Sequence, residues 1–122
     1  MKYLFGLLTN LLLISTSLAA GAPPKCPDPN QFQRVPMIIK KHAHDWYTLQ
    51  VAKFGTNEKW SFIISRFDPQ EPRDIVGKAT SVVKSLAKLP EPIYETNDTW
   101  GTHWYCYYPN QLGYATFAKT YR

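Results

Sequence analysis

Cysteine and histidine are scarce in this sequence, with two and three residues respectively among 122. The two cysteines, Cys26 and Cys106, allow only one disulfide within a monomer. Neither a Cys-x-x-Cys-His site for covalent haem nor a Gly-x-Ser-x-Gly nucleophile motif is present. The acidic residues are scattered, without the distinctive spacing of paired glycosidase carboxylates. These absences predict a non-enzymatic protein, and the exception would be a reduced Cys106 acting as a nucleophile beside His103.

Strong positive charge is also lacking. The formal net charge is +5, but no run of basic residues exceeds the pair Lys40–Lys41. Without a clustered basic patch or a nucleic-acid-binding motif, nucleic acid is not a predicted partner.

Long apolar runs are absent after the first residues of the chain. Leu4 to Ile14 is apolar, follows a short basic start, and precedes Ser17-Leu-Ala19, which has the small residues that signal peptidase recognises. We therefore expect residues 1–19 to be a signal peptide, with an uncleaved anchor as the alternative. Residues 20–122 then form a single domain of modest size, exported through the inner membrane to the periplasm or the medium, monomeric and without a transmembrane segment.

The start of the mature chain is rich in proline. Five prolines within residues 20–36 predict an extended or looped arm on the surface. In an exported chain Cys26 and Cys106 are expected to form a disulfide that ties this arm to the domain, and two free thiols are the alternative.

Periodic segments indicate an α+β fold. Residues 46–52 and 60–67 alternate as strands, with Ile63 and Phe67 on the face opposite Trp60; residues 35–39 suggest an edge strand.

An apolar stripe over residues 75–86 predicts a helix that begins near Asp68 or, because of Pro72, a few residues later. Packing on a sheet fits this stripe better than membrane binding does, because the cationic face is sparse. Residues 102–108 and 114–119 predict a hairpin. Residues 91–99 predict a connection, with a short strand at Tyr94 as the alternative. The result is a four- to five-stranded antiparallel sheet with one helix on one face, in the order (β)ββαββ, with one disulfide.

The predicted hairpin offers a candidate binding row. If Cys106 faces the core, His103, Tyr105 and Tyr107 lie on the opposite face, where they are candidate ligand-binding residues. Such a row, with lysines nearby, can contribute to a haem site; the alternative is that the aromatics only pack and exclude water.

A second candidate is a metal site at His42 and His44. In an extended segment the two imidazoles lie on one face and can bind zinc or copper. The alternative is a solvated polar turn before the strand that begins near Trp46.

Several segments resemble one family of bacterial proteins. They are Cys26-Pro27, Trp46, Phe54-Gly-Thr-Asn-Glu-Lys-Trp-Ser-Phe62, Lys84-Ser-Leu-Ala-Lys-Leu89, Trp104-Tyr-Cys-Tyr107 and Gly113-Tyr-Ala-Thr-Phe-Ala118. Together they resemble small secreted proteins from Legionella and its relatives, some of them labelled haemin-binding protein. The resemblance covers nearly all of the mature chain. It implies an exported protein linked to haemin binding or host interaction, but it carries over no catalytic residue and no haem ligand.

Two functions follow as expectations. The first is a non-enzymatic secreted binding protein, with haemin as the one named ligand. The second is a secreted, virulence-associated factor that binds a host or envelope protein through a sheet edge or an exposed aromatic face.

Overall fold

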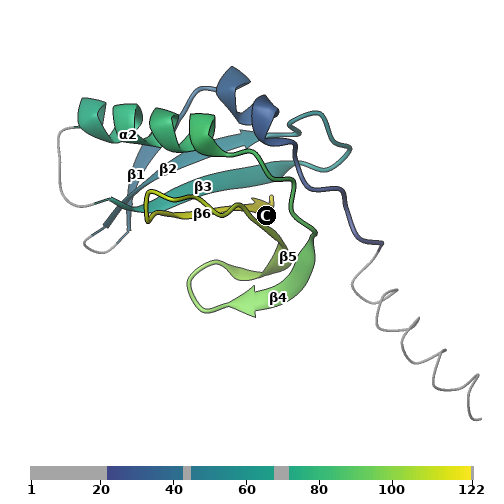
Figure 1. The fold of residues 1–122 in the computed structure, drawn as a ribbon. Coiled ribbons are helices and arrows are strands. Elements are labelled where there is room, and N and C mark those ends of the chain that lie inside the picture. Colours follow the sequence, from purple (N-terminus) through teal and green to yellow (C-terminus); the bar gives the residue numbers. More distant parts are fainter. Residues whose placement is uncertain (1–21, 43–44, 68–71, 122) are drawn as a thin grey trace, which may run out of the picture.

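The computed structural model describes residues 22–42, 45–67 and 72–121 (Figure 1). The elements are η1 (Pro29–Arg34), β1 (Ile38–His42), β2 (Asp45–Ala52), β3 (Trp60–Phe67), α2 (Pro72–Ser85), β4 (Ile93–Asn97), β5 (Gly101–Tyr107) and β6 (Ala115–Thr120). Within these residues the strands form one antiparallel sheet in the order β1-β2-β3-β6-β5-β4. The α+β class is confirmed.

The number of strands was predicted too low, because the sheet has six strands among the residues that the structure describes. The segment that was interpreted as a connection contains β4, which pairs with β5 along its whole length. β4 is an edge strand whose Ile93 and Tyr94 are both exposed, so it lacks the alternation of buried and solvated residues that reveals a strand in sequence.

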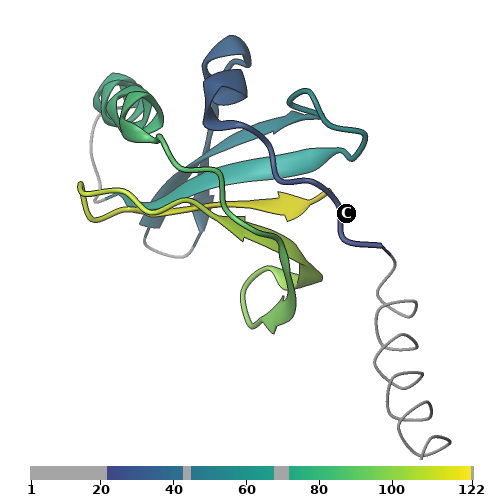
Figure 2. The same ribbon diagram turned by 45° about the vertical axis from the view of Figure 1, so that its right-hand side comes forward.

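The main core lies between the sheet and α2. Figure 2 shows α2 and η1 on the same face of the sheet. Ile75, Ala79, Val82 and Val83 are buried against Phe62 and its neighbours on β3. The helix begins at Pro72, a residue that suits a first turn, and Asp68 lies outside the described residues.

The proline-rich arm exposes many of its residues, but it also contributes buried side chains to the core, which the sequence pattern did not predict. Its 3-10 helix η1 buries Phe32, whose ring stacks on Phe62 with centroids 3.6 Å apart. Buried Gln50 of β2 donates from Nε2 to the carbonyl oxygens of Phe32 and Val35, each at 2.6 Å. A single proline-rich segment thus fills the side of the sheet that α2 leaves open.

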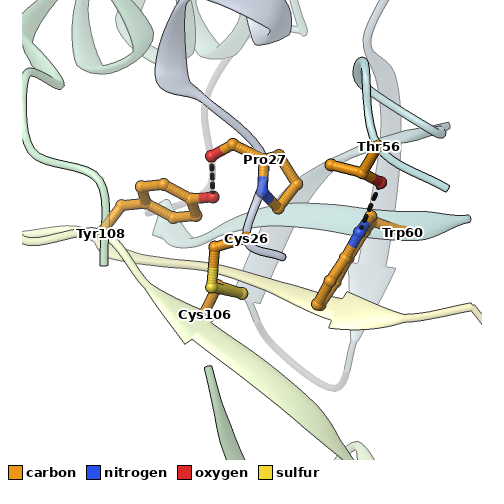
Figure 3. The surroundings of a disulfide bond; sticks show 6 residues. All are labelled: Cys26, Pro27, Thr56, Trp60, Cys106 and Tyr108. Atoms are coloured by element: carbon orange, nitrogen blue, oxygen red, sulfur yellow. Dashed lines mark hydrogen bonds between the residues drawn. A yellow bond between two sulfur atoms is a disulfide. The ribbon is translucent and has the colours of Figure 1, made fainter. Parts of the chain in front are cut away.

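The expected disulfide is present. Cys26 and Cys106 are bonded, and both are buried (Figure 3). Beside the disulfide, the Tyr108 hydroxyl donates to the carbonyl oxygen of Pro27. Cys106 packs in the helix-side core, the orientation on which the candidate binding row depended.

The turn between β2 and β3 uses positive φ angles at Phe54 (51°) and Gly55 (78°). Thr56 N donates to Lys53 O at 2.9 Å, which closes a hairpin turn of the mirror-image type. A phenylalanine is unusual in this conformation. Its ring is buried against Phe32 at 5.0 Å, and this burial offsets the strain.

A β-bulge interrupts β3. Trp46 pairs with Phe67 and Thr48 with Ile64, so two steps along β2 face three steps along β3. The extra residue reverses the alternation, and Phe67 packs in the helix-side core instead of facing the other way as predicted. Arg66 sits in this bulge with φ of 75°.

Candidate functional site

The face of the sheet opposite α2 carries a second, smaller apolar cluster. Ile63, Tyr105 and Phe117 are buried there, and Tyr47, Leu49 and Trp100 pack against them. The β4–β5 hairpin curls away from the helix side in both ribbon views (Figures 1 and 2). This curvature lets the hairpin shelter part of a face that no described helix covers.

Trp100 stands in the turn between β4 and β5. Asn97 at the end of β4 organises this turn, because its Oδ1 accepts hydrogen bonds from Thr99 N at 2.8 Å and Trp100 N at 3.0 Å. Such an Asx arrangement fixes the backbone of a short turn. This turn therefore fixes the backbone of Trp100 and with it the position of the indole.

The Trp100 indole reaches the opposite end of the sheet. Its ring lies 5.3 Å from that of Tyr47 in an edge-to-face arrangement and 5.9 Å from that of Phe117 on β6. The His42 ring at the end of β1 lies 5.9 Å from it. The two hairpins at the ends of the six-stranded sheet therefore meet through Trp100.

A cleft of about 380 Å³ opens beside these contacts, and we call it the Trp100 cleft. Its aromatic lining includes Tyr47, Trp100, Tyr107 and Phe117, and its polar lining includes His42, Asp45, Arg66, Asn97 and Thr99. The volume is within the range of about 300–1,000 Å³ typical of small-molecule sites.

Arg66 is the backbone outlier of this cleft. A non-glycine residue in the left-handed region costs on the order of 1–3 kcal/mol and persists where its surroundings enforce it. Its side chain is exposed and lines the cleft. The bulge thus presents a permanent cation next to aromatic rings.

Tyr105, one member of the predicted row, is not available to a ligand. It does lie opposite the helix, as predicted, but the residue is fully buried. Its hydroxyl donates to Gly101 O at 2.6 Å, and its ring stacks on Tyr107 at 5.8 Å. Burial, followed by the charge of Glu95, raises the pKa of Tyr105, so the phenol stays protonated.

The other two members of the row differ in their relation to the cleft. Tyr107 is exposed and lines it, and its hydroxyl donates to the Glu95 carboxylate. Partial burial first, and this hydrogen bond second, raise the pKa of Tyr107. His103 is partly buried, with its Nδ1 at 3.4 Å from Thr120 Oγ1 and its ring 5.9 Å from that of Tyr105, and it is not part of the described cleft lining.

Only one member of the predicted His42 and His44 metal site lies within the described residues. His42 ends β1, exposed and beside Trp100, whereas His44 lies outside the described residues. Within the described ranges no three His, Cys, Asp or Glu side chains are grouped as they would be to hold a metal ion. The imidazole of His42 lines the Trp100 cleft.

Sequence reasoning missed the residues that form the cleft across the sheet. Trp100 lies in a turn, outside any alternating pattern, and Arg66 looks like an ordinary strand residue. The Asn97-Asp-Thr-Trp100 turn gave a local signal, since asparagine followed by small polar residues favours an Asx turn. Nothing local indicates that this turn contacts Tyr47.

Comparison of the chain with known protein families, with curated proteins and with solved structures finds no match. None of the helices in the described part of the chain has both the length and the apolar character needed to cross a bilayer.

Proposed function

We propose that this chain is an exported, non-enzymatic binding protein that holds a small planar ligand in the Trp100 cleft. The observation that carries the proposal is the meeting of Trp100 with Tyr47 across Phe117, which places aromatic rings from both ends of the sheet around one cleft. The apolar leader and the buried disulfide support export.

The lining of the cleft favours a flat, partly apolar ligand. Aromatic side chains offer large apolar contact area, and they stack or pack edge to face with other rings. Exposed polar and charged groups at the same place can orient such a ligand. A volume near the lower end of the usual range favours a ligand of one or two fused rings, or the edge of a larger ring system.

Haemin is the named candidate, because of the resemblance to secreted proteins labelled haemin-binding. When bound, haemin would supply a ferric iron that a histidine or tyrosine side chain can hold. The cleft contains residues of the required kinds: aromatic surface for one edge of the macrocycle, the imidazole of His42 for the iron and the guanidinium of Arg66 for a propionate. Tyr107 suits the iron less well than His42 does, because its hydroxyl already donates to the Glu95 carboxylate.

Titration of residues 20–122 with haemin tests this function. We expect a saturable shift of the Soret band, which His42→Ala alters in position and Trp100→Ala weakens by about tenfold in affinity, the loss expected of one large aromatic contact. His103→Ala is the matched control and leaves both unchanged. The absence of a saturable shift would exclude haemin. A shift that depends on His103 and not on His42 would place the site elsewhere.

The exposed edge strand β4 supplies a second control, because it is the surface best suited to the competing function of partner binding. Ile93 and Tyr94 are exposed there and can accept an added strand. The double variant Ile93→Lys, Tyr94→Lys makes this edge unfavourable for an added strand and changes no residue of the cleft lining. We expect haemin affinity to remain unchanged in it.

A further inference from the structure

The bulge at Arg66 is an unusual place for arginine. A left-handed bulge residue is most often glycine, and asparagine also tolerates this backbone well. The chain nevertheless has an arginine there with φ of 75°, exposed and lining the Trp100 cleft. Among the residues that the structure describes, Arg66 makes no ion pair with a carboxylate. Its exposed guanidinium is a cation in the lining of the cleft.

We propose that the Trp100 cleft selects aromatic carboxylates, with the Arg66 guanidinium receiving the carboxylate while the ring lies against Trp100 and Tyr47. This inference rests on the proposed site and names the chemical class of its ligand. The planar fork of arginine matches the two oxygens of a carboxylate, and two parallel hydrogen bonds fix orientation as well as charge.

The charge of Asp45 opposes this selection. Asp45 is exposed and lines the same cleft, so it repels an anion that approaches Arg66. Asn97 and Thr99 add uncharged polar groups to the lining. The preference for an anion therefore depends on Arg66, and removal of the Asp45 charge strengthens it.

Isothermal titration of residues 20–122 with 2-naphthoate and with 2-naphthamide tests the proposal. These probes share a two-ring body and differ in the carboxylate. We expect naphthoate to bind about tenfold or more tightly than the amide, the preference that one charge-assisted contact supplies. Arg66→Asn weakens binding of naphthoate much more than binding of naphthamide and so removes that preference, Arg66→Lys retains part of it, and Asp45→Asn increases it.

Thermal unfolding of the same variants supplies a second readout. Arg66→Asn relieves the left-handed strain, so its midpoint is expected to equal or exceed that of the wild type while naphthoate affinity falls. A merely structural role for Arg66 predicts a lower midpoint and unchanged selectivity.

The inference would be overturned if the wild type bound the acid and the amide equally, or bound neither. It would also be overturned if Arg66→Asn kept the preference for the acid. Its failure is distinguishable from failure of the haemin proposal. A Soret shift that depends on His42, together with no preference for naphthoate, would contradict only the carboxylate inference. Naphthoate binding that depends on Arg66, without a Soret shift, would contradict only the haemin proposal.

Discussion

Single tyrosine hydroxyls connect elements that are distant in the chain. The Tyr108 ring packs edge to face against Phe32 and Phe62, and its hydroxyl donates to the Pro27 carbonyl oxygen beside the disulfide. Deprotonation would lose the donor and leave a buried negative charge facing a carbonyl oxygen. Burial, with a smaller effect of Asp28, therefore raises the pKa of Tyr108.

Alkaline pH is expected to destabilise the protein through Tyr108 and Tyr105. Both pKa values are raised in the folded state, so the folded state retains protons that the unfolded state releases above about pH 10. Stability from these phenols is fully present below that pH and falls above it, by up to about 1.4 kcal/mol per pH unit for each. Burial lowers the pKa of Lys119 in the folded state. Folding therefore becomes somewhat more favourable as the pH rises toward the pKa of a free lysine. Urea unfolding between about pH 9 and pH 11 measures the balance.

Tyr108→Phe isolates one of these contributions. The variant loses the hydrogen bond to Pro27, so it is less stable than the wild type at neutral pH by about 1 kcal/mol. Its stability should then fall less steeply above about pH 10. Parallel curves for the two proteins would show that Tyr108 does not titrate with unfolding.

At the scale of the elements, those with a clear period could be predicted from sequence. The strand at 60–67 and the apolar stripe of α2 each carry enough alternation or helical spacing to fix their type. β4 is a short edge strand with exposed apolar residues, so its existence depends on pairing with β5. The bulge at Arg66 could not be predicted from the sequence either, because it depends on the register between β2 and β3.

The candidate site was predictable only in part. Strand alternation correctly put His103, Tyr105 and Tyr107 on the face opposite Cys106. It did not predict that Tyr105 is buried, since that depends on the curl of the hairpin and on contact with Phe117. The two-residue alternation of a strand predicts the face on which a side chain lies. The exposure of that side chain depends on which other parts of the chain cover the face.

The disulfide is expected to contribute a large part of the stability of the arm and the domain. Cys26 and Cys106 are 80 residues apart, and the loss of unfolded-state entropy on closing such a loop amounts to roughly 4 kcal/mol. We expect the double variant Cys26→Ala, Cys106→Ala to remain folded, because Phe32 and Gln50 still hold the arm, but to unfold with about 3–4 kcal/mol less free energy. Urea unfolding measures the difference. Reductant added to the wild type should reproduce it and should leave the double variant unchanged. A loss below about 1 kcal/mol would show that packing alone fixes the arm.

At the scale of the whole molecule, the two faces of the sheet are stabilised differently. One face is covered by α2 and the proline-rich arm, which bury a large apolar core. The other has a small cluster closed by the curl of the sheet upon itself. Trp100 is the contact that joins the two ends of this curl, so the shape of the cleft and the stability of the hairpin depend on the same side chain.

Trp100→Ala is therefore expected to loosen one end of the molecule while the other stays intact. The indole is only partly buried, so the loss of unfolding free energy should be about 2 kcal/mol, below the usual cost of removing a fully buried tryptophan. Amide hydrogen exchange should accelerate in β4 and β5 and near His42, and stay unchanged at Phe62 in the centre of β3. Trp100→Phe, which retains an aromatic ring against Tyr47 and Phe117, is the matched control and should restore most of the protection. Uniform acceleration through the whole sheet, or none in β4 and β5, would show that the hairpin is not held in its curled position by this contact.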